Sequence, residues 1–123
     1  MTIEQKYLKL VKEIKDTYTL IDNLKILIAT DLLELETIYK TEELDYPSFK
    51  SLVLDLIGRS YSRVLPLLRI AHYINKQNID SKELLNISIT HIEVVAKADV
   101  KWSETTKQNL SSLSYKLLKD KYK

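Results

Sequence analysis

The chain has 123 residues, of which 45% are hydrophobic and 29% are charged, and its formal net charge is +2. This length fits one domain with its own core, and this composition excludes a disordered chain. Because there is no cysteine, disulfides, thiol nucleophiles and thiolate metal sites are excluded too. One glycine and two prolines are too few for a turn-rich all-β fold or for a glycine loop that binds phosphate.

No apolar run reaches the ~18 residues of a membrane span. The first residues also lack the hydrophobic region of a signal peptide. We therefore expect a cytoplasmic protein without a membrane segment.

The first two predicted helices cover residues 3–17 and 20–40. Apolar residues at spacings of three and four make the first an amphipathic surface helix, and Thr2 with Gln5 resembles a capping box. The second is apolar around most of its circumference, which predicts a central helix with neighbours on several faces. We place the break at residues 17–19, because they are β-branched or aromatic and one helix from 2 to 40 would far exceed the usual length.

The next two helices are predicted over residues 48–63 and 66–76. Ser48 follows Pro47 and caps the first of them, which tolerates Gly58 at a cost of about 1 kcal/mol. Pro66 lacks a backbone donor and clashes with the preceding turn, so we expect a kink or a break there.

The last two helices are predicted over residues 82–98 and 103–120. Asp80 to Glu83 is a cap signature, and a linker around Trp102 separates the two helices. Residues 87–90 alternate like a strand, but a lone strand would have no partner. The predicted fold is therefore an all-α, single-domain bundle of five or six helices over residues 1–123, with a lysine-rich C-terminal end.

The sequence has no constellation typical of catalysis or of metal binding. His72 and His91 have no histidine or carboxylate three or four residues away, the spacing that places two ligands on one helical face. There is no Gly-x-Ser-x-Gly motif. We therefore expect no enzymatic activity, no metal and no cofactor.

Charge is strongly segregated along the chain. Residues 30–55 contain seven acidic residues and two lysines, a net charge of −5. Residues 56–79 have no acidic residue and a net charge of +4, and residues 97–123 again carry +4. All three arginines lie between residues 59 and 69.

The arginine segment is the candidate binding surface. Arginine favours bidentate contact with carboxylate or phosphate, and Arg59 and Arg63 are four residues apart, as neighbours on one helical face would be. Aromatic residues near it can stack on a partner. The predicted partner-binding residues are Arg59, Arg63, Arg69, His72, Tyr73, Lys76 and Trp102. The alternative is that the arginines pair with the acidic second helix inside the fold.

One order of segments is similar to a known family. An acidic helix end over residues 42–49 is followed by Ser62-Arg63-Val64-Leu65 and then by Asp80-Ser81-Lys82-Glu83. This order resembles the helical domain of GINS replication subunits, although the small β-domain of that family has no counterpart. The resemblance implies an accessory subunit of a DNA-replication complex.

The function these features favour is a non-enzymatic protein-interaction module, an accessory subunit or adaptor of a larger assembly. The alternative is a nucleic-acid-binding accessory subunit that uses the segment from Arg59 to Lys76 and the C-terminal lysines. Because a helix apolar on most sides needs several neighbours, we also expect self-association or binding within a complex.

Overall fold

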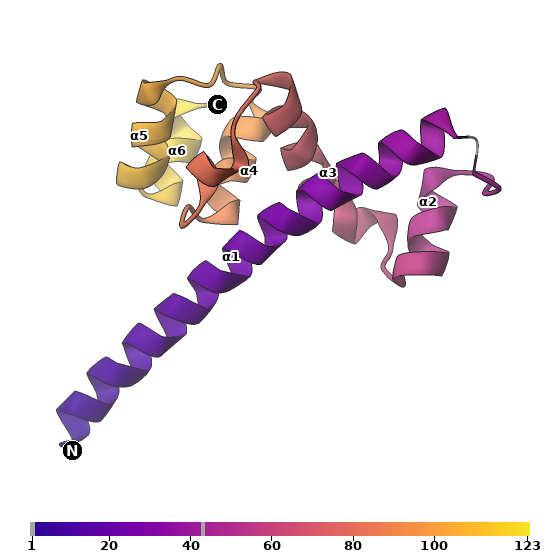
Figure 1. Ribbon diagram of the computed structural model, residues 1–123. Coiled ribbons are helices and arrows are strands. Elements are labelled where there is room, and N and C mark those ends of the chain that lie inside the picture. Colours follow the sequence, from indigo (N-terminus) through magenta and orange to yellow (C-terminus); the bar gives the residue numbers. More distant parts are fainter. Residues whose placement is uncertain (1, 43) are drawn as a thin grey trace.

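The longest element is one straight helix, α1 (Ile3–Thr41), which crosses the whole molecule in the computed structural model (Figure 1). The structure describes residues 2–42 and 44–123, and Glu43 of the acidic helix end lies outside them. The predicted capping box is confirmed. The Gln5 backbone N–H donates to Thr2 Oγ1 over 3.1 Å, and Gln5 Oε1 accepts from the Thr2 N–H over 3.0 Å.

The predicted break at residues 17–19 is wrong, because α1 runs through them. The Thr17 hydroxyl donates to the carbonyl of Glu13 over 2.8 Å, and the Thr19 hydroxyl donates to the carbonyl of Lys15 over 3.1 Å. A threonine that bonds to the preceding turn satisfies its hydroxyl inside a helix. With no glycine or proline nearby, nothing ends α1 here.

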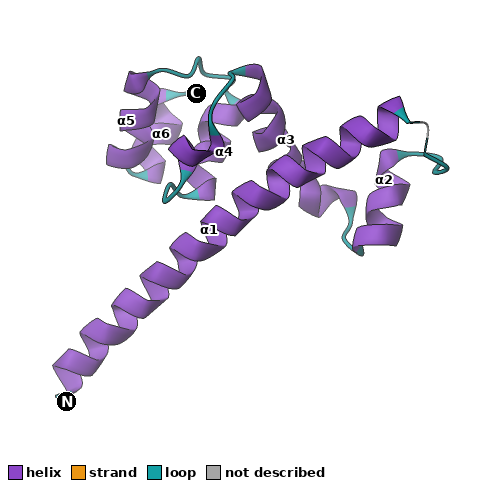
Figure 2. Ribbon diagram, viewed as in Figure 1, coloured by secondary structure: helices purple, strands orange, loops and turns teal. Residues whose placement is uncertain are grey.

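Shorter helices follow, and the part of the chain that the structure describes has no strand (Figure 2). The strand alternative for residues 87–90 is therefore wrong. The predicted helix over 82–98 is divided into a short 3-10 helix and an α-helix, and the predicted helix over 103–120 is two helices. The elements after α1 are α2 (Phe49–Leu52), the π-helix η1 (Val53–Ile57), α3 (Tyr61–Lys76), the 3-10 helix η2 (Ser81–Leu84), α4 (Ile89–Lys97), α5 (Glu104–Ser112) and α6 (Tyr115–Lys121).

Gly58 and Pro66 have roles that differ from the predicted ones. Gly58 ends η1 with a left-handed φ of 77°, and its N–H donates to the Val53 carbonyl. Pro66 lies inside α3 and does not break it. A proline in the second turn removes only one helical bond, the one to the Ser62 carbonyl, and the buried Val64 and Leu68 hold α3 in place on either side.

Two apolar cores lie along α3, and together with the elements around them they form the body of the molecule. The larger core joins α1 to the C-terminal half of α3 and to α4, α5 and α6, with Ile70, Leu84, Ile92, Val95 and Leu118 at its centre. The smaller core joins α1 to the N-terminal half of α3 and to α2, and consists of Leu32, Phe49, Leu52, Val53, Val64 and Leu68. The bundle fold is thus confirmed, with α3 as the element common to both cores.

The N-terminal half of α1 extends away from the body and does not pack against the other helices (Figure 1). At 1.5 Å per residue α1 is about 58 Å long, roughly twice the diameter of a small domain. Polar contacts with the body begin at Asp22 and Asn23, which bind the backbone N–H groups of Ile89 and Asn86. Every side chain in residues 2–18 except Val11 is exposed.

Two expectations for α1 are therefore corrected. The apolar stripe of residues 3–17 faces solvent instead of a core: Ile3 is 90% exposed and Ile14 is 56% exposed. The following segment is packed on one side only, because Ile26, Ala29 and Leu32 are buried whereas Leu24 is 49% exposed. In the described ranges, no helix combines the length and the apolar character needed to cross a membrane.

Candidate interaction surfaces

Five of the seven predicted partner-binding residues lie on α3, one lies just before it, and Trp102 lies between α4 and α5. Arg59 lies before the helix begins, where its guanidinium donates to the Gly58 carbonyl over 3.2 Å. Lys76 is the last residue of α3, about 24 Å away along the helix. The expected pairing of Arg59 with Arg63 on one helical face is therefore wrong, because α3 begins only at Tyr61.

The three arginines of the predicted set are accessible and carry no internal ion pair, unlike His72 and Lys76. Arg59, Arg63 and Arg69 are exposed, and none of them is in an ion pair with the carboxylates of residues 2–42 and 44–123. Pairing between α3 and the acidic end of α1 is limited to one contact, in which His72 Nε2 lies 2.9 Å from Glu36 Oε1. The arginine side chains can therefore reach an anionic partner.

The side chains of Tyr73 and Trp102 pack in or against the larger core and form hydrogen bonds within the fold. Tyr73 is 3% exposed and its hydroxyl donates to the Val100 carbonyl, so it cannot stack on a partner. Burial raises the pKa of Tyr73 to about 12, with smaller contributions from Asp99 and Tyr122. Trp102 is half-buried, and its indole N–H donates to Glu83 over 3.3 Å.

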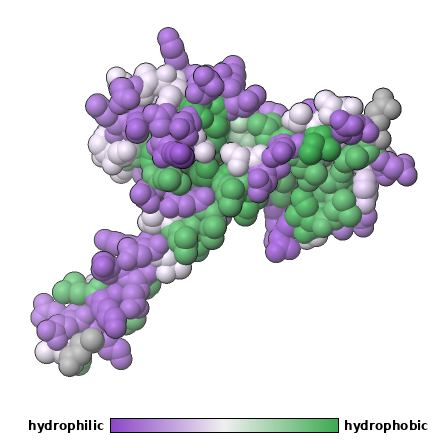
Figure 3. Space-filling view, in the orientation of Figure 1, coloured by the Kyte–Doolittle hydropathy of each residue, from purple (hydrophilic) through white to green (hydrophobic). Residues whose placement is uncertain are grey.

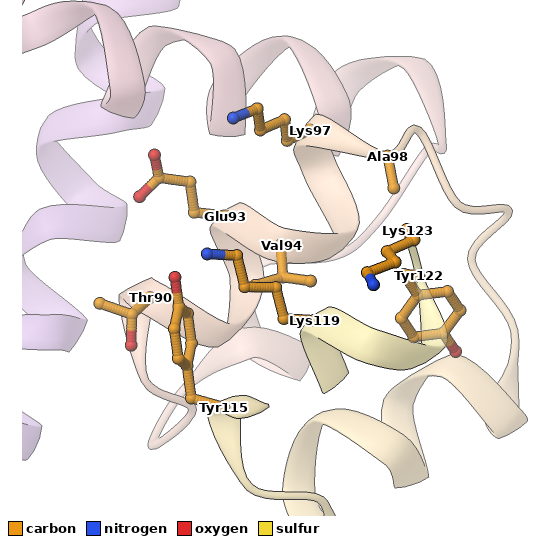
Figure 4. A pocket seen from close by; sticks show the side chains of 9 residues that line it. All are labelled: Thr90, Glu93, Val94, Lys97, Ala98, Tyr115, Lys119, Tyr122 and Lys123. Carbon is orange, nitrogen blue, oxygen red and sulfur yellow. The ribbon is translucent and has the colours of Figure 1, made fainter. Parts of the chain in front are cut away.

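A basic groove and a basic pocket meet at Lys97. The groove lies between α3 and α4 and is lined by Arg69, His72 and Lys76, the last of which pairs with Asp99. The pocket lies between α4 and α6, has a volume of about 490 Å³, and is shown in Figure 4. Its charged and aromatic lining consists of Glu93, Lys97, Tyr115, Lys119, Tyr122 and Lys123. Sequence reasoning missed this pocket because it depends on how α6 packs on α4.

Seven exposed apolar side chains of α1 follow a heptad repeat, whereas Leu8, Tyr18, Leu20, Leu27 and Ile38 are exposed outside it. From residue 3 to residue 28 the spacing alternates strictly between four and three, which places these positions on one seam of the helix. Thr17 is the single polar member, and the other seven are all exposed. We call this set the α1 seam: Ile3, Tyr7, Leu10, Ile14, Thr17, Ile21, Leu24 and Ile28.

The α1 seam lies on a different face from the one that the body covers. The side chains that the body buries, Ile26, Ala29 and Leu32, are not members of the repeat. Figure 3 shows apolar side chains along α1 where it leaves the body. Sequence reasoning missed the seam because the predicted break at residues 17–19 divided it into two short stripes.

A second exposed apolar patch lies at the other end of the molecule, on η1 (Figure 3). It consists of Leu54, Leu56 and Ile57. Beside it, the Tyr46 hydroxyl donates to Asp55 over 2.9 Å, and this bond is the main reason that the pKa of Tyr46 is raised. The patch is much smaller than the α1 seam.

Comparison of the chain with protein-family models, with curated proteins and with solved structures finds no match. The resemblance to GINS subunits therefore has no support from a family model. Within residues 2–42 and 44–123, no three histidine, aspartate or glutamate side chains gather as metal ligands would.

Proposed function

We propose that this protein is a non-enzymatic interaction module of the cytoplasm, an accessory subunit or adaptor that binds another protein through the α1 seam. The observation that carries the proposal is the exposure of seven apolar side chains in one row, interrupted only by Thr17, on a projecting helix. Exposed apolar surface that is contiguous marks an interaction site more often than scattered apolar residues do.

The energetics favour a partner. Burying a leucine or isoleucine side chain completely contributes about 1.5–3 kcal/mol relative to leaving it in water. The seam holds six such side chains, and a partner helix that covers them removes their apolar surface from water. No side chain of the body reaches the seam at its N-terminal end, since residues 2–10 are all exposed.

The histidines fit a structural role rather than a catalytic one. His72 contacts the carboxylate of Glu36, and His91 lies against the ring of Tyr115 with 6.4 Å between the centroids. Both contacts are accounted for by packing between elements, which supports a module without catalysis.

The experiment compares two matched pairs of glutamine substitutions. Ile14→Gln with Ile21→Gln removes apolar side chains from the seam, whereas Lys12→Gln with Lys15→Gln changes exposed residues outside it. Proteins recovered with the tagged chain from cells of its source are measured by quantitative mass spectrometry, together with the mass of the assembly. We expect the first pair to lose the bound partner and the second to keep it, and equal recovery by both would contradict the proposal.

A second candidate function, nucleic-acid binding, has its own observation. Arg69 in the groove and Lys119 and Lys123 in the pocket flank Lys97, which lines both hollows, so basic side chains continue from α3 to α6. Such a row is the usual footprint of phosphate contacts. Tyr115 and Tyr122 border the pocket and can stack on bases.

Fluorescence polarisation with a labelled oligonucleotide at two salt concentrations tests this candidate. Phosphate binding must weaken steeply with salt, and loss of one phosphate contact lowers the salt slope by about 1. We expect Lys97→Gln to reduce this slope and Lys12→Gln to leave it unchanged. Absence of binding at low salt would reject nucleic acid as the partner.

A further inference from the structure

We propose that the partner of the α1 seam is a second copy of this chain, paired antiparallel along residues 3–28. This inference rests on the proposed function, since it names the protein that covers the seam. It is carried by flanking charges of α1 that meet as opposite charges in an antiparallel pair and do not meet in a parallel pair in register.

The core positions match without a gap. When two α1 helices lie antiparallel with residue 3 opposite residue 28, every seam position lies opposite another seam position. Ile3 lies opposite the partner's Ile28, Tyr7 opposite the partner's Leu24, and Leu10 opposite the partner's Ile21. At the centre, Thr17 lies opposite the partner's Ile14, so the one polar position does not face its own copy. The whole length of the seam is covered.

One of the two rows that flank the core matches as well, whereas on the other row Lys6 and Glu13 lie beside the partner's Leu27 and Leu20. In this register Glu4 lies diagonally across the core edge from the partner's Lys25, and the two-fold symmetry of a homodimer repeats the pair at the other end. Val11 lies beside the partner's Tyr18, which adds an apolar pair on each side of the centre. Flanking charges of this kind set the orientation of paired helices.

A parallel pair in register also aligns every seam position, each with its own copy, but it lacks the flanking pairs of opposite charge. It would place Thr17 against the partner's Thr17 in the core. Its flanking pairs would be Lys6 with the partner's Val11, Glu13 with the partner's Tyr18, and Leu20 with the partner's Lys25. Each of these sets a charged side chain against an apolar or aromatic one, so no opposite charges meet. Charge complementarity therefore favours the antiparallel pair.

The seam stays exposed where α1 meets the body. Ile26 and Ala29, which the body buries, alternate with Leu24 and Ile28, which remain exposed beside it. The seam is therefore open to its C-terminal end. An antiparallel pair places the two bodies at opposite ends of a shared stretch about 39 Å long.

The mass of the free protein is the first test. Light scattering coupled to size-exclusion chromatography should give twice the chain mass of 14.4 kDa. Ile14→Gln with Ile21→Gln should give a monomer of unchanged helical content, and Lys12→Gln with Lys15→Gln should remain a dimer. A monomeric wild-type protein at high concentration would overturn the inference.

Disulfide formation between copies tests the direction, because the natural chain has no cysteine. A mixture of Leu10→Cys and Ile21→Cys chains should form a covalent dimer on oxidation. Each variant alone should not, since residue 10 then lies 11 positions, or about 16 Å, from residue 10 of the partner. A disulfide needs Cα atoms within about 7 Å. Crosslinking of Leu10→Cys alone, without crosslinking of the mixture, would establish a parallel pair and overturn the inference.

Charge reversal tests the register. Glu4→Lys or Lys25→Glu alone replaces two attractive pairs with two repulsive ones, and should weaken the dimer roughly tenfold. Mixing the two variants restores both attractive pairs, so they should form a heterodimer of wild-type affinity. Equal affinity of all three would overturn this register.

The two proposals fail in different ways. If the wild-type chain is a monomer but its seam variants lose another protein from the cell, this inference falls and the proposed function stands. If the chain is a monomer and the seam variants lose no protein, both fall.

Discussion

Glu36 of α1 is a carboxylate that is only 7% exposed, and its contacts join α1 to α3. Its Oε1 lies 2.9 Å from His72 Nε2 and 3.5 Å from Lys40 Nζ. A buried polar group left without its partner costs more than the hydrogen bond itself contributes, because the group has already lost its water. His72, predicted as a partner-binding residue, thus has a role within the fold.

We predict that His72→Ala lowers the free energy of unfolding by about 1–3 kcal/mol, because Glu36 then keeps only the longer contact with Lys40. Urea unfolding followed by circular dichroism measures the change. Arg69→Ala is the control, since this exposed side chain lies on the same helix, and it should cost less than about 0.5 kcal/mol. Equal costs would show that the contact with Glu36 contributes nothing.

Tyr73 leads to a second prediction at the residue scale, which concerns how the stability of the fold depends on pH. Burial raises its pKa to about 12, so the folded chain keeps the phenolic proton to higher pH than the unfolded chain, whose tyrosine pKa is about 10. The contribution of this group to stability is therefore complete below about pH 10 and is lost as the pH rises toward 12.

Tyr73→Phe should remove that part of the pH dependence, and should also cost about 0.5–1.5 kcal/mol at neutral pH through the lost bond to the Val100 carbonyl. Unfolding in urea at a series of pH values from neutral to alkaline measures both effects. Tyr115→Phe controls for the removal of one tyrosine at an exposed position. If the wild type and Tyr73→Phe lose stability in parallel above pH 10, Tyr73 is not the group responsible.

At the scale of elements, α1 shows that an apolar side chain on a helix is not always buried in the single chain. Leu32 is 4% exposed in the smaller core, whereas Leu24 is 49% exposed on the seam, although both belong to the same apolar segment. A pattern that is apolar on several sides predicted a helix buried on several sides. In the single chain, however, the body covers only one of these sides.

We predict that Leu32→Ala costs roughly 2–5 kcal/mol, as a large-to-small change in a core does. Leu24→Ala should cost much less in dilute protein, where the seam is uncovered. Thermal and urea unfolding at low chain concentration measure both, and Lys9→Ala at an exposed i,i+4 pair with Glu13 is a control expected below about 0.5 kcal/mol. A large cost for Leu24→Ala under these conditions would place Leu24 in a core of the single chain.

Sequence patterns predicted the elements well where local chemistry decides them. The caps at Thr2, Ser48 and Asp80 are confirmed, because each side chain accepts a hydrogen bond from the first turn that follows it. These bonds span only two or three residues. They can therefore be inferred without knowledge of the tertiary fold.

The errors arise where distant packing or two competing local effects decide. At Pro66 the helix continues since its neighbours Val64 and Leu68 are buried, which the sequence order does not reveal. At Thr17 two local effects compete: β-branching disfavours the helix, whereas the absence of glycine and proline lets it continue, with the Thr17 hydroxyl bonded to the Glu13 carbonyl. The predicted break at residues 17–19 also prevented recognition of the α1 seam, because the seam exists only if α1 is continuous.

At the scale of the molecule, the acidic and basic segments of the sequence form few ion pairs with each other. The acidic C-terminal part of α1 and the basic helix α3 pack against each other, yet the contact between their charges is the one from His72 to Glu36. Lys76, the cation at the end of α3, pairs with Asp99 after α4 instead. The arginines near the N-terminal end and middle of α3 therefore remain exposed, without an ion pair to the acidic part of α1.

Reversing two of these charges separates the remaining hypotheses for the arginines. Exposed charges contribute little to stability, so Arg63→Glu with Arg69→Glu should leave the melting temperature nearly unchanged. The same double change should abolish binding of an anionic partner, because the two new carboxylates would repel the negative charges of that partner. Arg63→Gln with Arg69→Gln removes the charges without reversing them and should weaken binding less. A fall in melting temperature comparable to that of Leu32→Ala would instead make the arginines internal partners of the acidic segment, and the surface would then lose its role even if binding were lost as well.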